Sequence, residues 1–189
     1  MAKIREEEIV DRWSVLIEEA NGQGKEVFKL TEANLKDLDV PNIELVQKEI
    51  SPSLMKRLKG KRRTFLVVKN NYLEGYLMYI GAADYGRQLS VSWYLTSEST
   101  GLGRLLAKLP WWLQILFFPL LILLAVYNIF RRKKSVSPAN MDLFDLEELT
   151  AYVTTVHHAL IDATKEVSQT VGFDFTKVDQ KSKGFLNIS

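Results

Sequence analysis

An uncharged apolar block in the middle of the chain constrains its fold more than any other feature. The 22 residues from Leu109 to Phe130 contain fourteen Leu, Ile, Phe or Val side chains and no charged one. A helix of this length is about 33 Å long, enough to cross a hydrocarbon core of about 30 Å. The alternative is a buried helix in a soluble protein, but a helix that is apolar all round needs protein walls on every side. We therefore expect a membrane-embedded segment.

The residues around this block are also typical of a membrane segment. Tryptophans near one end and Tyr127 near the other resemble the aromatic belts at membrane interfaces. Cations flank it on both sides: Lys108, Arg131, Arg132, Lys133 and Lys134. We expect the embedded segment to span residues 105–134, with these residues inside the membrane: Leu109, Trp111, Trp112, Phe117, Phe118, Pro119, Leu120, Leu124 and Phe130.

Pro119 lies near the middle of the block and leaves two topologies open. In a single span it would kink the helix, and the two halves of the chain would lie on opposite sides of the membrane. In a re-entrant hairpin it would mark the bend, and each arm, about 15 Å long, would enter one leaflet only. We favour the hairpin, because the apolar faces before and after the block can then cover each other. The folded domain is expected on the cytoplasmic face.

The composition outside the block is that of a globular domain. The 189 residues carry a net charge of +2, which gives no support for nucleic acid as a partner. Cysteine is absent, which excludes disulfides, thiolate catalysis and thiolate metal sites.

Three segments predict an antiparallel β-meander: residues 64–69, 72–82 and 88–96. In the third, Leu89, Val91, Trp93 and Leu95 alternate with smaller or more polar residues, which is typical of a strand with one buried face. The short turns between the segments favour antiparallel pairing. Residues 43–50 are a weaker strand prediction.

Two amphipathic helices are predicted to pack on this sheet. Residues 3–20 place Ile9, Trp13, Leu16 and Ala20 at helical spacing, and residues 142–171 form a longer pattern. Short helices are expected from Thr31 to Leu38 and over 51–58. The long helix has an apolar seam whose spacing fits either packing on the sheet or coiled-coil self-association: Leu146, Leu149, Val153, Val156, Leu160, Ala163 and Val167.

The densest charge run puts six cations within eight residues: Lys56, Arg57, Lys59, Lys61, Arg62 and Arg63. Such a run can contact anionic lipid head groups, and near a membrane each cation contributes about 1 kcal/mol. A solvated loop is the alternative interpretation. Nucleic acid is disfavoured, because no aromatic side chains interleave the cations.

No catalytic, cofactor or metal motif emerges from the sequence. His157 and His158 are the only histidines, and adjacent helical positions point about 100° apart, so one metal cannot bind both. A surface hydrogen bond between His158 and Asp162 is the simpler interpretation. The stretch from Gly101 to Arg104 is only a fragment of a glycine-rich loop.

The sequence thus predicts an α+β domain interrupted by a membrane segment. Residues 1–100 would form the N-terminal helix and sheet, 105–134 the embedded segment, 141–171 the C-terminal helix, and 172–189 an irregular tail. The expected function is a non-enzymatic membrane-anchored scaffold, adaptor or accessory subunit, with the lipid membrane and a protein partner or second copy as its contacts. The alternatives are a membrane-tethered ligand-binding or sensor domain, or an enzyme acting on a lipid-borne substrate.

Overall fold

The computed structural model describes residues 9–50, 63–73, 75–97, 141–186 and 188. These form a five-stranded antiparallel sheet of order β1-β5-β4-β3-β2 with two helices, which confirms the α+β class. The elements are β1 (Ile9–Ile17), α1 (Gly24–Asp37), β2 (Ile43–Ile50), β3 (Arg63–Asn70), β4 (Tyr76–Tyr85), β5 (Gln88–Ser97), α4 (Leu143–Thr170) and the short 3-10 helix η4 (Phe175–Lys177).

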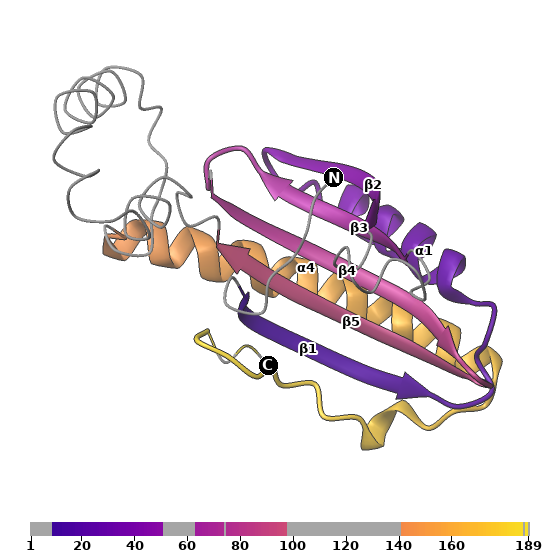
Figure 1. Ribbon diagram of the computed structural model, residues 1–189. Coiled ribbons are helices and arrows are strands. Elements are labelled where there is room, and N and C mark those ends of the chain that lie inside the picture. Colours follow the sequence, from indigo (N-terminus) through magenta and orange to yellow (C-terminus); the bar gives the residue numbers. More distant parts are fainter. Residues whose placement is uncertain (1–8, 51–62, 74, 98–140, 187, 189) are drawn as a thin grey trace, which may run out of the picture.

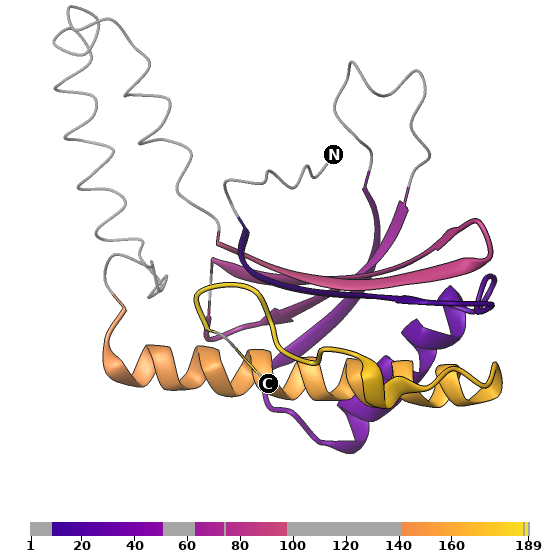
Figure 2. The same ribbon diagram turned by 90° about the horizontal axis from the view of Figure 1, so that it is seen from below.

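Both helices cover the same face of the sheet (Figures 1 and 2). The core between the layers contains alternate residues of the strands, among them Leu66 and Val68 of β3 and Trp93 of β5, together with α4 residues such as Val156. The Tyr152 hydroxyl of α4 donates to the Val68 carbonyl at 2.9 Å. The N-terminal sheet and the C-terminal helix therefore share one core.

Strands β3, β4 and β5 form the predicted meander, and β2 is the strand predicted more weakly over 43–50; each of the four pairs with the next. Leu89, Val91, Trp93 and Leu95 are fully buried, as their alternation predicts. The β4–β5 turn is closed by pairing of Tyr85 with Gln88, and Gly86 within it has a φ of +65°. Glycine suits this turn because side chains make a positive φ costly.

The prediction of an N-terminal helix over 3–20 is wrong for its described part. Ile9–Ile17 is β1, which pairs antiparallel with β5 at an edge of the sheet. Burial along β1 alternates: Asp11, Trp13 and Ile17 are buried. Arg12, between the first two, and Leu16, next to Ile17, are exposed. The strand was missed because a polar residue, Asp11, takes one of the buried positions and breaks the alternation of apolar and polar residues. The apolar residues that remain also fit the spacing of a helix. Residues 1–8 lie outside the described residues.

The expected short helix from Thr31 is in fact the second half of α1, which begins at Gly24. Thr31 does not cap it: its hydroxyl donates to the Val27 carbonyl at 2.7 Å, one turn earlier in the same helix. The expected helix over 51–58 lies outside the described residues.

The long C-terminal helix begins one residue later than predicted, because Asp142 is its N-cap. The Asp142 side chain accepts from the Asp145 amide at 2.9 Å, and the Asp145 carboxylate accepts from the Asp142 amide at 3.3 Å. This reciprocal capping box satisfies amides that a helix start leaves without partners.

The far face of the sheet carries a second apolar cluster. Ile50, Val67 and Tyr79 form it, and Phe65 and Leu77 pack against them. These side chains point away from the two helices, because their neighbours along β3 and β4 belong to the main core.

Within the described residues, no helix is both long enough and apolar enough to span a bilayer. The expected embedded segment, 105–134, and its flanking cations lie outside the described residues. Membrane insertion therefore stays a prediction of the sequence.

Candidate apolar pocket and C-terminal clasp

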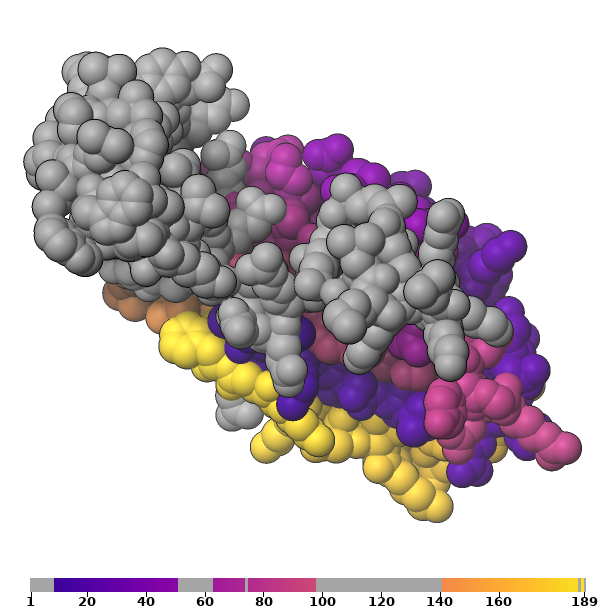
Figure 3. Space-filling model, in the orientation of Figure 1, coloured from indigo at the N-terminus to yellow at the C-terminus, as the bar shows by residue number. Residues whose placement is uncertain are grey.

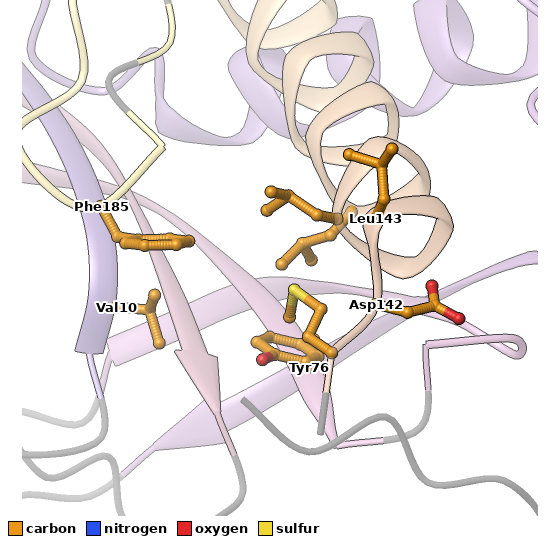
Figure 4. Close-up of a pocket in the computed structure, with 8 residues that line it drawn as sticks. Val10, Tyr76, Asp142, Leu143 and Phe185 are labelled. Carbon is orange, nitrogen blue, oxygen red and sulfur yellow. The ribbon is translucent and has the colours of Figure 1, made fainter. Parts of the chain in front are cut away.

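A pocket of about 460 Å³ lies at the end of the sheet where α4 begins. This volume falls in the range of small-molecule sites, about 300–1,000 Å³. Its described walls come from four separate segments, as Figure 4 shows: Val10, Tyr76, Met141, Asp142, Leu143, Leu146, Leu149 and Phe185. Apart from Asp142 and the Tyr76 hydroxyl, these side chains are apolar.

The rim of this pocket exposes large apolar side chains. Leu143 is 66% exposed and Phe185 67% exposed, and Phe144, next along α4, is 77% exposed. Farther along α4, the residues that face the sheet are buried, beginning with Leu149. The first turn of α4 thus presents apolar surface that the described part of the chain does not cover.

Tyr76 is the polar residue inside the pocket. Its side chain is only 1% exposed, yet its hydroxyl has no hydrogen-bond partner among the described residues. No buried side-chain oxygen in the described part of the chain lacks a partner, so this oxygen must be open to the cavity. Burial, and to a smaller extent the Asp145 carboxylate, raise the pKa of Tyr76. The hydroxyl therefore keeps its proton and can donate.

The carboxylates near the pocket are already engaged in capping α4. Asp142 points its carboxylate away from the apolar side chains in Figure 4, consistent with its bond to the Asp145 amide. Carboxylates this close to the Tyr76 hydroxyl disfavour a second anion there.

The pocket lies between the two points where the chain leaves and rejoins the described fold. Ser97, the last residue of β5, pairs with Tyr76 in the sheet. Met141, the first residue described after the gap, lines the pocket together with Tyr76. Ser97 and Met141, the described residues that flank 98–140 in the chain, therefore lie at the same end of the domain, beside the pocket.

A second cluster, next to the pocket, ties the C-terminal tail to β1, and we call it the C-terminal clasp (Asp11, Trp13, His157 and residues 179–186 with 188). The tail lies along β1 in Figures 1 and 3. The Lys183 amide donates to the Arg12 carbonyl at 2.7 Å and the Phe185 amide to the Val10 carbonyl at 3.2 Å. The tail thereby covers the unpaired edge of β1, which would otherwise invite pairing with another chain.

Asp11 is the centre of the clasp and is 1% exposed. Its carboxylate accepts from the Ser182 hydroxyl at 3.1 Å, from the Leu186 amide at 3.0 Å and from the Arg12 amide at 2.7 Å. Gly184 passes so close that an added Cβ would lie 2.6 Å from the Asp11 Cα. Only glycine fits there without a shift of the backbone.

His157 is fully buried in the clasp, between two tryptophan rings. The Trp93 indole N–H donates to its Nδ1 at 2.8 Å, so the proton of the neutral ring lies on Nε2, which donates to the Gln180 carbonyl at 2.8 Å. Burial lowers the pKa of His157. A second ring proton would face the Trp93 donor, so this arrangement fits the neutral ring alone.

The sequence-predicted basic segment lies largely outside the described residues, which include only its last member, Arg63. Arg63 is exposed, opens β3 and pairs with Ile50. The antiparallel order puts this pair at the opposite end of β3 from Tyr76 and Ser97. Since β3 has eight residues, the two ends are about 23 Å apart.

The predicted helix seam points into the chain's own core. Six of its residues are buried: Leu149, Val153, Val156, Leu160, Ala163 and Val167. Leu146, the first residue of the seam, is half-buried and lines the pocket. The stripe is thus used in packing within the chain.

The pocket and the clasp were both missed by sequence reasoning. Buried Asp11 and His157 signal a polar network only once their burial is known. The exposed pair Leu143 and Phe144 was a usable signal, because both precede the regular seam of α4 and have no place in it. Among the described residues, no group of three His, Asp or Glu side chains could hold a metal ion.

No family model matches this chain, and comparison with curated proteins and with solved structures gives no significant match. Its function is therefore argued from the pocket and its position alone.

Proposed function

We propose that this chain is a membrane-tethered domain that binds an apolar ligand, and that it is not an enzyme. One observation carries the proposal: the apolar pocket lies beside Ser97 and Met141, the described residues that flank 98–140 in the chain. That segment contains the uncharged 22-residue block. A ligand taken from, or delivered to, the membrane would have a short path to the pocket.

The shared core supports the hairpin topology for the embedded segment. A single span would place the sheet and α4 on opposite sides of the membrane. The Tyr152–Val68 and Trp93–His157 hydrogen bonds join them within one fold. Under the proposal, residues 105–134 enter and leave the membrane on the same side, with the bend near Pro119. The folded domain is then on the cytoplasmic face.

If the basic segment Lys56–Arg63 also contacts the membrane, it constrains how the domain lies on the membrane surface. Arg63 and Ser97 are at opposite ends of the sheet, so both can approach one membrane only if the strands run roughly along its surface. In that orientation Lys56–Arg63 would contact anionic lipid head groups, in addition to the embedded anchor. Replacing Arg62 and Arg63 with Gln should then weaken binding to anionic vesicles, and salt should weaken it too.

A scaffold or adaptor is the second candidate function, favoured by the exposed rim of the pocket. Leu143, Phe144 and Phe185 could pack against an apolar surface of a protein partner, since exposed apolar clusters often mark interaction sites.

Purification of the full chain from its native membrane separates these two functions. The proposal expects the protein to resist alkaline carbonate washing and to carry an extractable apolar small molecule, detected by mass spectrometry. A protein recovered with a stoichiometric protein partner and no small molecule would favour the scaffold instead.

A further inference from the structure

The pocket has chemical features that narrow the class of its ligand. The walls described above are apolar, which favours a single hydrocarbon chain rather than a polar metabolite. The Tyr76 hydroxyl is a polar group of the described walls that has no hydrogen-bond partner among the described residues. A ligand that leaves it unpaired would give up a buried hydrogen bond.

The partner of this hydroxyl must be an uncharged acceptor. The hydroxyl is a donor at neutral pH, and the capping carboxylates Asp142 and Asp145 stand nearby. A fatty-acid carboxylate at this point would meet two like charges, whereas an ester or amide carbonyl would not. At the start of α4, the capping box already engages the Asp145 amide, so that donor is not available to a ligand anion.

We propose that the pocket binds the acyl chain of a neutral lipid ester, with the ester carbonyl accepting a hydrogen bond from the Tyr76 hydroxyl. The acyl chain would pack against the apolar lining residues, which include Val10 and Leu146, with Phe185 at the rim. Figure 4 shows Phe185 on the same side of the cavity as Val10. The inference rests on the proposed function only for the source of the lipid, which is the adjacent membrane.

Photo-crosslinking of the full chain tests this directly. The probe is a monoacylglycerol with a diazirine near the end of its acyl chain, and adducts are located by peptide mass spectrometry. One sample is reconstituted in phosphatidylcholine vesicles, and a second is held in amphipol with no bilayer. We expect adducts on peptides that contain Val10, Leu146 or Phe185 in both samples. Excess glycerol monolaurate should suppress them, and laurate, ionised at alkaline pH, should compete far less.

Two variants and a matched control make the test specific. Leu146→Trp fills the cavity and should lower pocket labelling at least about 10-fold. Tyr76→Phe keeps the shape but removes the donor, and should weaken competition by glycerol monolaurate about 2- to 10-fold, while competition by laurate is unchanged. Leu16→Trp adds the same ring at an exposed position on β1, away from the pocket, and should leave labelling unchanged.

The outcomes separate this inference from the proposed function. Adducts confined to residues 105–134, or pocket adducts that persist in Leu146→Trp, would overturn it. Equal competition by laurate and glycerol monolaurate would also overturn it, because the neutral ester would not be selected. If the chain fails to enter vesicles but labels at the pocket in amphipol, the ligand class stands and the membrane tether fails.

Discussion

The clasp and the pocket share three segments, β1, α4 and the C-terminal tail, and yet have opposite character. On β1, Val10 lines the pocket, whereas its neighbour Asp11 lies at the centre of the clasp. On the tail, Phe185 lines the pocket, whereas the amide of its neighbour Leu186 bonds to Asp11. In the clasp, the Asp11 carboxylate and both nitrogens of the His157 ring are matched by partners within the chain. In the pocket, apolar side chains are exposed and a hydroxyl is free.

This difference indicates which region is structural and which is available for binding. A buried polar group without a partner costs about 1–3 kcal/mol, so the clasp tolerates no loosening. The pocket rim has no such requirement, since exposed Leu143 and Phe144 contribute little to the core. Substitutions in the clasp should therefore lower stability, and substitutions at the rim should change binding alone.

The largest expected effect is that of Asp11→Ala. It removes the acceptor for the Ser182 hydroxyl and the Leu186 amide, and should lower the free energy of unfolding by about 3–5 kcal/mol. Urea denaturation of the full chain in a mild detergent, followed by tryptophan fluorescence, measures it. Asp162→Ala, an exposed aspartate of α4, is the matched control and should stay within about 0.5 kcal/mol of the parent. Equal effects of the two would mean that the clasp is not a stabilising network.

Gly184→Ala should come next, with a loss of about 1–3 kcal/mol, because the added methyl group meets the Asp11 Cα and carboxylate. Hydrogen exchange of the Lys183 and Phe185 amides, which bond to β1, should accelerate in the same variant. The exposed neighbour Lys181→Ala serves as control. Unchanged exchange in Gly184→Ala would contradict the close passage of the tail.

A smaller effect concerns pH, through His157. Its pKa is lowered in the folded chain, so below about pH 6.5 the unfolded chain binds the proton first and stability falls with falling pH. The slope of the free energy of unfolding against pH should be at most about 1.4 kcal/mol per pH unit. It should be present only between the pKa of His157 in the folded chain and its higher pKa in the unfolded chain. Urea midpoints across this window should show the slope in the parent and in His158→Gln but not in His157→Gln. A slope that survives in His157→Gln must come from other groups.

The smallest effect on stability is expected at the pocket rim. The double variant Leu143→Ser and Phe144→Ser should change the free energy of unfolding by only about 0.5 kcal/mol, because both side chains are mostly exposed. Labelling by the monoacylglycerol probe should fall in the same variant. A loss of stability comparable to that of Asp11→Ala would make the rim part of the core and remove the contrast between the two regions.

The parts of the fold that the sequence predicted are those whose pattern is local. The alternation of Leu89 to Leu95 and the three-four spacing from Leu149 to Val167 each report one face of one element. The strand β1 was missed because its inward Asp11 is compensated by Ser182 and Leu186, far along the chain. A long-range partner of this kind leaves no trace in the local pattern.

The pocket was beyond prediction for a similar reason. Its described walls come from β1, β4, α4 and the tail, and only tertiary packing brings Val10, Tyr76, Leu146 and Phe185 together. The sequence predicted linkers on both sides of the apolar block. It could not predict that Ser97 and Met141, which flank this region, lie beside one pocket. The unpaired hydroxyl of Tyr76 likewise becomes informative only when its burial is known.

The most direct test of this account is the sidedness of the two segments that flank the apolar block. The chain has no native cysteine, so Ser99→Cys and Ser137→Cys can each carry a unique thiol. Each variant is treated with an impermeant thiol reagent in intact cells or sealed vesicles, and again after permeabilisation, when both must react. A domain tethered by a hairpin predicts that both thiols are protected or that both react. Protection of one and reaction of the other would establish a single span and contradict the account.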